Sequence, residues 1–166
     1  KGTIYVLVRP KSIGKLDELR EFWGKDSLKR VVPIKGDLGL PKLGVGKADV
    51  AKLKGKIRHF YHLGAVYDLE ASAEAMEKAN ITGTKGALEF AEAVNAGCFH
   101  LVSSIAAAGL YRGTFTDDMF EEAEELDHPY HRTKHDSEAM VRANGRIPFR
   151  VYRPGAVLGH SQTGFI

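Results

Sequence analysis

The sequence predicts a doubly wound α/β fold, in which helices cover both faces of a parallel sheet. Two observations predict it: strand-like and helix-like segments alternate along the chain, and the connections between them are short. No internal repeat, low-complexity tract or linker divides the 166 residues. We therefore expect a single domain with a substantial core.

Five strands are predicted from runs rich in β-branched and aromatic residues, at positions 3–8, 31–34, 59–63, 99–102 and 149–152. Helices are predicted where apolar residues recur three or four positions apart, at 16–23, 50–53, 72–96 and 130–143. We interpret the glycine pair at 44 and 46 as a loop, because it does not lie between a strand and a helix that opens on the ligand-binding crevice. The acidic run at 121–127 is interpreted as a solvated loop or a helix start.

Composition narrows the class of protein. The formal net charge is +3, but basic and acidic residues are interspersed, so nucleic acid is not expected as a partner. The one cysteine, Cys98, cannot form an internal disulfide, which fits a reducing compartment, and we expect the protein to be cytoplasmic. No apolar run is long enough for a transmembrane segment, and no signal-peptide pattern is present.

The residues that follow each predicted strand are the first candidates for a ligand site. In doubly wound sheets, ligands bind at the carboxyl ends of the strands. In chain order these residues are Arg9, Gly36-Asp37-Leu38, Leu63-Gly64-Ala65, Ser103-Ser104 and Arg153-Pro154-Gly155. We expect them to share one edge of the sheet.

Tyr130 and Lys134 are candidates for acid–base chemistry. They stand four residues apart on a predicted helix, so both side chains project from one face. An ammonium near a phenol stabilises the phenolate, as a general acid or base requires. Upstream, the Ser103 and Ser104 hydroxyls could donate to a substrate oxygen. The alternatives are a solvated helix pair for the first two residues and a strand-end turn or helix cap for the serines.

Six short motifs occur in the order found in one family. They are Gly36-Asp37-Leu38, residues 62–65, residues 80–84, residues 102–104, residues 130–134 and Arg153-Pro154-Gly155. With them the whole chain resembles the extended short-chain dehydrogenase/reductase family. Within that family it looks most like fatty acyl-CoA reductases and thioester reductase domains, through residues 6–9, residues 130–138 and the spacing from 153–157 to 163–164.

The resemblance implies that residues 1–166 are a partial NAD(P)-binding Rossmann domain. The family's first strand, its Gly-rich turn and its C-terminal substrate lobe are missing from the sequence. The first strand of such a domain lies in the middle of the sheet, in the order 3-2-1-4-5-6. We therefore expect the remaining strands to flank a gap.

The resemblance also implies catalytic roles. Tyr130 would donate a proton, Lys134 would bind the nicotinamide ribose, and Ser104 would hold the substrate carbonyl, with Ser103 the weaker candidate for that role. Asn80 would support the geometry of the active site. Its alternative interpretation is an amide on the surface of a helix.

For the cofactor, the resemblance implies that Asp37 and Leu38 bind the adenine. Leu63, Gly64 and Ala65 would run beside the cofactor, although family members often have alanine at position 64. The nicotinamide end would contact Pro154, Gly155 and Ala156, and Ser103 is a further candidate for cofactor binding. Arg9 follows the expected second strand, where a basic residue accommodates a 2′-phosphate, so NADP is favoured over NAD. The alternative for Arg9 is an exposed arginine at a strand end.

The expected function is NAD(P)H-dependent reduction of a thioester-activated acyl group, carried by CoA or a carrier protein, to an aldehyde or alcohol. The alternatives are a nucleotide-sugar epimerase or dehydratase, a hydroxysteroid-type dehydrogenase, and a nucleotide-binding scaffold module without turnover. No metal is expected, because His131 and His135 have no identifiable third ligand. The sequence leaves open whether the protein forms a homodimer.

Overall fold

A computed structural model describes residues 2–24, 26, 29–66, 71–156, 159 and 161–162. The motif positions 157, 163 and 164 lie outside these residues. The strands are β1 (Ile4–Val8), β2 (Val31–Lys35), β3 (Phe60–His62), β4 (Phe99–Val102) and β5 (Phe149–Tyr152). The α-helices are α1 (Lys15–Trp23), α3 (Lys47–Leu53), α4 (Ala73–Met76), α5 (Gly83–Ala93) and α6 (Pro129–Ala143). Short turns of other helical types are η1 (Pro10–Ser12), η2 (Pro41–Gly44), η3 (Glu77–Thr82) and η4 (Ile105–Ala108).

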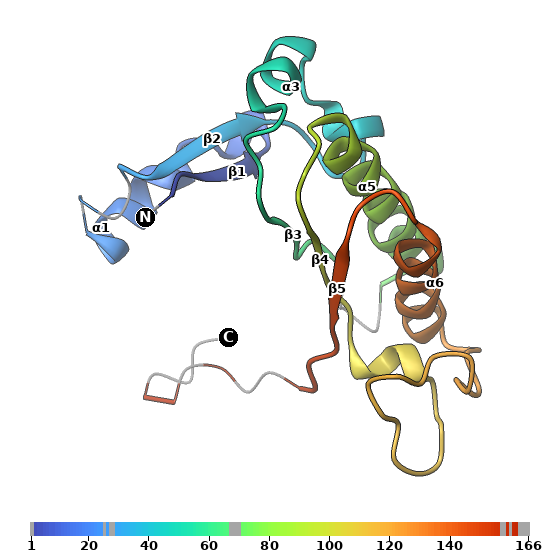
Figure 1. Cartoon of the computed structure of the whole chain (residues 1–166). Helices are drawn as coiled ribbons and strands as arrows, with labels where there is room; N and C mark the ends of the chain where they lie inside the picture. The colour runs from blue at the N-terminus through green and yellow to red at the C-terminus, as the bar shows by residue number, and fades with distance from the viewer. Residues whose placement is uncertain are drawn as a thin grey trace.

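All paired strands are parallel, and helices lie between strands along the chain (Figure 1), which confirms the predicted fold class. The described strands form two sheets, one of β1 and β2 and one in the order β3-β4-β5. In the expected strand order, the central strand would lie between these two sheets, beside β1 and β3.

One hydrophobic core joins the two sheets. Phe99 and Leu101 of β4 are buried with Ala87 and Ala91 of α5. Ile34 of β2 belongs to the same cluster, so the two-stranded sheet is packed to the rest of the domain through side chains.

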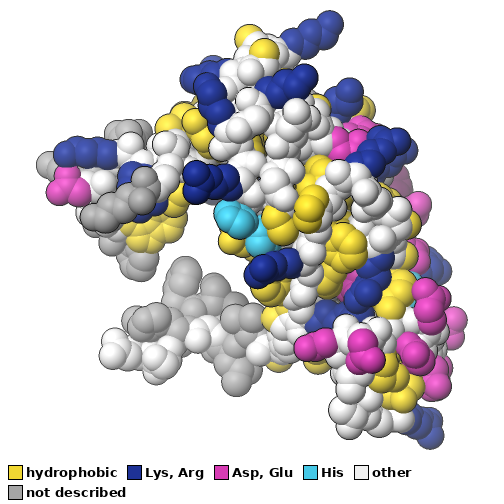
Figure 2. Space-filling view, in the orientation of Figure 1, with side chains coloured by type: hydrophobic (Ala, Val, Ile, Leu, Met, Phe, Trp, Pro, Cys, Tyr) yellow, Lys and Arg dark blue, Asp and Glu magenta, His cyan; other side chains and the backbone are white. Residues whose placement is uncertain are grey.

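The sheet β3-β4-β5 differs from the expectation that helices cover both faces. Helices α5 and α6 pack against it, whereas Tyr61 and Tyr152 on the other face are 58% and 42% exposed. The His100 ring stacks between them, at centroid distances of 4.3 Å from Tyr61 and 5.9 Å from Tyr152. Figure 2 shows histidine side chains beside Lys and Arg side chains on the face turned to the viewer. Among the described residues, helices therefore cover one face of this sheet and leave the other face exposed.

The predicted helix at 72–96 is divided into α4, the π-helical turn η3 and α5, which ends three residues earlier than expected. The Thr84 hydroxyl donates to the Asn80 carbonyl (2.6 Å) beside the π-turn, and Asn95 adopts a left-handed φ of 52° after α5. The segment predicted as a loop at positions 44 and 46 joins two helical elements: Gly44 ends the short turn η2, and Gly46 directly precedes α3. Residues 121–127 contain turns and no helix.

Candidate active site

The residues after β2 and β3 lie together at the carboxyl edge, as predicted. A Cβ added to Gly64 would lie 2.7 Å from Leu38 Cδ2, and one added to Gly83 would lie 2.9 Å from Leu38 Cγ. Leu38 therefore occupies the space that two glycines leave open. An alanine at position 64 would require the Leu38 side chain to shift.

The candidate residues at this edge of the sheet remain partly or fully accessible to solvent. Asp37 is partly buried, and its Oδ1 accepts a hydrogen bond from the Gly39 N–H (2.9 Å), a short turn that fixes the carboxylate. Leu63 is 69% exposed and Ala65 is partly buried. Arg9 is exposed directly after β1.

The ends of β4 and β5 are joined by backbone hydrogen bonds. The Ser103 N–H donates to the Tyr152 carbonyl (2.8 Å), and the Ile105 N–H donates to the Pro154 carbonyl (3.2 Å). A Cβ added to Gly155 would lie 3.9 Å from Ile105 Cδ1. The structure thus brings the serine pair next to residues 154–155, while Ala156 follows as an exposed residue.

Helix α6 carries Tyr130 in its first turn and Lys134 one turn later. Pro129 opens the helix, and the ring of His128 accepts from the Tyr130 N–H at 3.1 Å, which caps its first turn. Lys134 is 4% exposed, and its Nζ donates to the Val102 carbonyl (3.0 Å) at the end of β4. Burial lowers the pKa of Lys134 to about 8, although the nearby Glu138 carboxylate opposes the shift. Tyr130 itself is partly buried.

Asn80 is buried rather than on the helix surface, so its alternative interpretation is wrong. Its amide donates to Thr133 Oγ1 (3.1 Å) and to the Val66 carbonyl (3.2 Å), while its Oδ1 accepts from the Val66 N–H (2.9 Å). Thr133 Oγ1 in turn donates to the Tyr130 carbonyl (3.2 Å). Asn80 therefore links the loop after β3 to the first turn of α6. Its position in the π-turn η3 fits the frequent occurrence of such turns at functional sites.

We expect Asn80→Ala to lower the free energy of unfolding by about 1–3 kcal/mol, because it leaves the partly buried N–H and carbonyl of Val66 without this partner and removes the hydrogen bond that Thr133 Oγ1 accepts. Denaturant titration measures the change. Asn144→Ala, which removes a partly buried hydrogen bond to Glu92 and an exposed one from the Arg146 N–H, is the matched control with a smaller effect. Equal stability of the two variants would contradict the linking role of Asn80.

The two serines differ in what their hydroxyls bind. Ser103 is buried and its Oγ donates to Glu138 Oε2 (2.8 Å). Ser104 is partly buried and its Oγ accepts from the Ala106 N–H (3.1 Å), so it caps η4 as the alternative interpretation expected. Because an accepting hydroxyl keeps its own proton, Ser104 can still donate to a ligand.

His62 and Glu138 are two site residues to which the sequence assigned no role. His62 is buried at the end of β3 and lies 3.0 Å from Thr84 Oγ1. Since Thr84 already donates to the Asn80 carbonyl, His62 Nε2 carries the proton of this bond. Burial, followed by the charge of Lys134, lowers the pKa of His62 to about 4, so the ring is neutral at pH 7.

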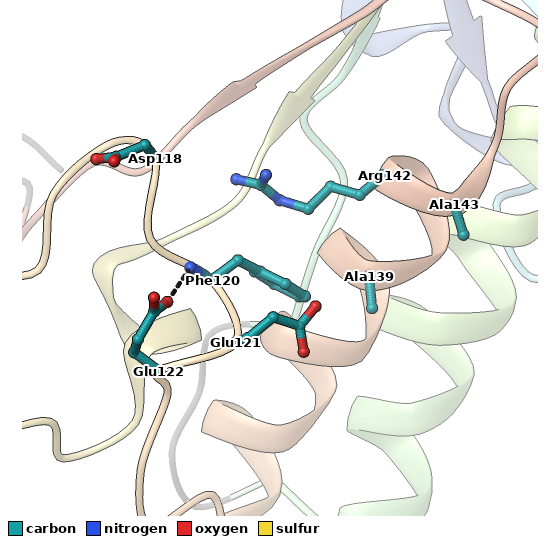
Figure 3. Close-up of a pocket in the computed structure, with 7 residues that line it drawn as sticks. All are labelled: Asp118, Phe120, Glu121, Glu122, Ala139, Arg142 and Ala143. Carbon is teal, nitrogen blue, oxygen red and sulfur yellow. Dashed lines mark hydrogen bonds between the residues drawn. The ribbon is translucent and has the colours of Figure 1, made fainter.

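A hollow of about 590 Å³ lies on the outer side of α6 and contains none of the predicted site residues (Figure 3). A second one, of about 660 Å³, borders the ends of β4 and β5 and includes Pro154 and Arg153. No helix among the described residues is long and apolar enough to cross a membrane. In that part of the chain no group of three potential metal ligands occurs.

The parallel strands, with accessible small and polar residues at their carboxyl ends, define a dinucleotide-binding α/β domain. Residues 1–166 match the NAD-binding family described as male sterility protein, and the chain belongs to that family. This membership confirms the resemblance to extended short-chain dehydrogenases/reductases. The cofactor of the family is a nicotinamide dinucleotide.

Relatives and a solved structure agree with this assignment. The chain is 31% identical, over 97% of its length, to 3% of a linear gramicidin synthase polypeptide of Brevibacillus parabrevis. A Drosophila melanogaster protein described as a fatty acyl-CoA reductase is 26% identical over 99% of the chain and 38% of its own length. The terminal R domain from the myxalamid PKS-NRPS biosynthetic pathway has a TM-score of 0.82 and 32% identity, covering 96% of this chain and 44% of that one. The chain thus spans less than half of each.

Proposed function

We propose that this chain is the cofactor-binding core of a reductase that acts on thioester-activated acyl groups. The observation that carries the proposal is the placement of the buried Lys134 ammonium at the end of β4, one turn from Tyr130 and next to the serine pair. This constellation supplies a proton donor, a cation and a hydroxyl at one edge of the sheet.

The residues present fit a nicotinamide dinucleotide. Asp37 offers a carboxylate acceptor suited to an adenine amino group, and Lys134 offers ammonium donors suited to ribose hydroxyls. The glycine at position 64 leaves space for the Leu38 side chain, so Leu38 lies beside the backbone of this strand end, where it can pack on an adenine ring. Leu63, Ala65, Ser103, Pro154, Gly155 and Ala156 would complete the binding surface.

A reduced nicotinamide cofactor bound by these residues would supply a hydride to the carbonyl carbon. Tyr130 protonates the oxygen that becomes an alkoxide, and Ser104 donates a hydrogen bond to the same oxygen. Lys134 stabilises the tyrosinate that forms when Tyr130 gives up its proton. Asn80 holds the first turn of α6, and with it Tyr130, through Thr133.

The relatives support a proposal for the substrate class. One is described as a fatty acyl-CoA reductase, and two others belong to a peptide synthase and to a PKS-NRPS pathway. We propose an acyl thioester, on CoA or on a carrier protein, as the substrate. Addition of hydride and a proton gives a hemithioacetal. Its C–S bond then breaks while the hydroxyl proton passes to the sulfur, which releases a thiol and an aldehyde, and a second reduction converts the aldehyde to the alcohol.

We propose NADP rather than NAD as the cofactor, because the exposed guanidinium of Arg9 follows β1 and suits a 2′-phosphate. Arg9→Asp is expected to weaken NADPH binding by about tenfold to a hundredfold, the effect of losing a hydrogen bond to a charged group. NADH binding should change little or improve. Isothermal titration calorimetry with both cofactors measures the ratio of the NADPH and NADH dissociation constants. Arg58→Asp, at an exposed position before β3, is the control. An unchanged ratio in Arg9→Asp would contradict a role for Arg9.

We also propose that residues 1–166 form part of a larger domain. The break between β1 and β3 supports a further strand between the two sheets. A substrate lobe outside these residues would supply most acyl-chain contacts.

The experiment that tests the proposed function is oxidation of NADPH by the complete native protein in the presence of a long-chain acyl-CoA, with aldehyde and alcohol identified by mass spectrometry. Acyl-dependent oxidation with either product supports the proposal. Binding of NADPH without acyl turnover would shift the assignment to a sugar or steroid enzyme, and absence of binding would leave a scaffold module.

A further inference from the structure

Glu138 is the most completely buried charged residue among those described in the chain, with an exposure of 0%. It lies on α6, one turn after Lys134. A buried carboxylate is costly unless hydrogen bonds and opposite charges satisfy it. Its contacts therefore indicate what the carboxylate holds in place.

Each oxygen of Glu138 accepts two hydrogen bonds. Oε1 accepts from Arg142 Nε (2.8 Å) and Arg153 Nη2 (2.6 Å), and Oε2 accepts from Ser103 Oγ (2.8 Å) and Arg153 Nε (3.1 Å). The fork-shaped contact with Arg153 fixes the orientation of both groups. The donors lie on α6 itself and directly after β4 and β5, so one side chain joins three elements.

Arg153 extends the network to the segment before α6. Its guanidinium donates to the carbonyls of Met119 (2.9 Å) and Thr116 (3.4 Å), and lies 5.1 Å from the centre of the Phe115 ring. Arg142 lies over the ring of Phe120, 4.8 Å from its centre (Figure 3). Glu138 thereby also anchors residues 115–120 through its two arginines.

We propose that Glu138 is a positioning residue of the candidate active site, which holds Ser103, and with it the adjacent Ser104, and serves as the counter-charge of Lys134. This inference rests on the proposed function. Ser103 is the residue between Val102, whose carbonyl binds Lys134, and Ser104. A displaced Glu138 would therefore disturb both the serine and the lysine of the site.

The charges around Lys134 give the inference a measurable signature. Glu138 raises the pKa of Lys134, against the larger effect of burial, while the neutral His62 adds no charge at pH 7. Burial alone would raise the pKa of Glu138, but hydrogen bonds from Arg153, Arg142 and Ser103 outweigh it, so the carboxylate is ionised. Without the carboxylate, the ammonium would lose the opposite charge that raises its pKa, and burial would favour its neutral form more strongly.

The test compares Glu138→Gln, Ser103→Ala and Glu92→Gln in the complete native protein, each first checked for folding by circular dichroism. Glu92 is the matched control, because it also binds an arginine, Arg146 at 2.9 Å, but contacts no candidate site residue. We expect kcat to fall about tenfold to a hundredfold in Glu138→Gln, the scale expected for misplacement of catalytic groups. The pH above which kcat/KM falls should move down by about one unit.

Ser103→Ala keeps both charges, so kcat should fall while the upper pH limit stays unchanged. It also carries the test if Glu138→Gln does not fold. Wild-type kcat and an unshifted pH limit in a folded Glu138→Gln, or wild-type kcat in Ser103→Ala, would overturn the proposal. If the wild-type protein shows no acyl turnover, the proposed function fails, and the pH dependence of NADPH binding in Glu138→Gln still tests the coupling to Lys134.

Discussion

Replacing Tyr130 with phenylalanine is expected to lower kcat by about 10²–10⁴-fold, the range for loss of a general acid. The substitution removes the proton donor and keeps the ring, so the affinity for NADPH should change little. Steady-state kinetics with an acyl thioester and a separate titration of NADPH distinguish the two quantities.

Tyr61→Phe is the matched control for this experiment. Tyr61 is exposed on the face of the sheet that α5 and α6 do not cover, far along the sequence from α6. The control should retain wild-type kcat. A Tyr130→Phe variant with the same kcat as Tyr61→Phe would show that another group donates the proton.

The second large effect is expected at Lys134, because its ammonium is the buried cation of the site. Its pKa of about 8 predicts that kcat/KM falls as the pH rises above about 8, when the ammonium loses its proton. Lys134→Met should lower kcat by about a hundredfold at neutral pH and abolish that upper limit. The pH profile of each variant measures both effects.

The free energy of unfolding should rise with pH over the range in which kcat/KM falls. The folded-state pKa of Lys134 lies below its ordinary value of 10.5, so burying the ammonium costs free energy below about pH 8, and this cost disappears as the pH rises from about 8 to 10.5. Lys134→Met should therefore be at least as stable as wild type at pH 7. Lys85→Met on the exposed side of α5 is the control. A Lys134→Met variant that is unfolded at pH 7 would show that Lys134 serves structure first.

Much of the fold was predictable, because strand and helix periodicities are local properties. The last two strands have the predicted bounds, and α6 differs only by Pro129 at its start. The π-turn η3 was not predictable, since it accompanies the contacts of Asn80 with Val66 and Thr133, which come from distant parts of the chain. Helix α3 begins three residues before the predicted start, because the prediction followed the apolar residues and the first turn is polar.

The candidate site was predictable where it depends on spacing within one element. The four-residue spacing of Tyr130 and Lys134 placed them together on α6, and strand ends identified Asp37 and the serine pair. The role of Glu138 depends on Arg153, which follows the next strand, so helix periodicity alone could not reveal it. A carboxylate on the buried face of a helix was the signal that could have found it. The roles assigned to Tyr130, Lys134 and Ser104 remain predictions.

The most direct test of the central claim is a single-turnover reaction of the complete native protein with an acyl thioester and NADPH that carries deuterium at the transferable position. We expect the deuterium on the carbonyl carbon of the aldehyde product in wild type, and no such product on the same time scale in Tyr130→Phe. Absence of deuterium from the aldehyde, or equal transfer by both proteins, would contradict a reductase that uses Tyr130 as its proton donor.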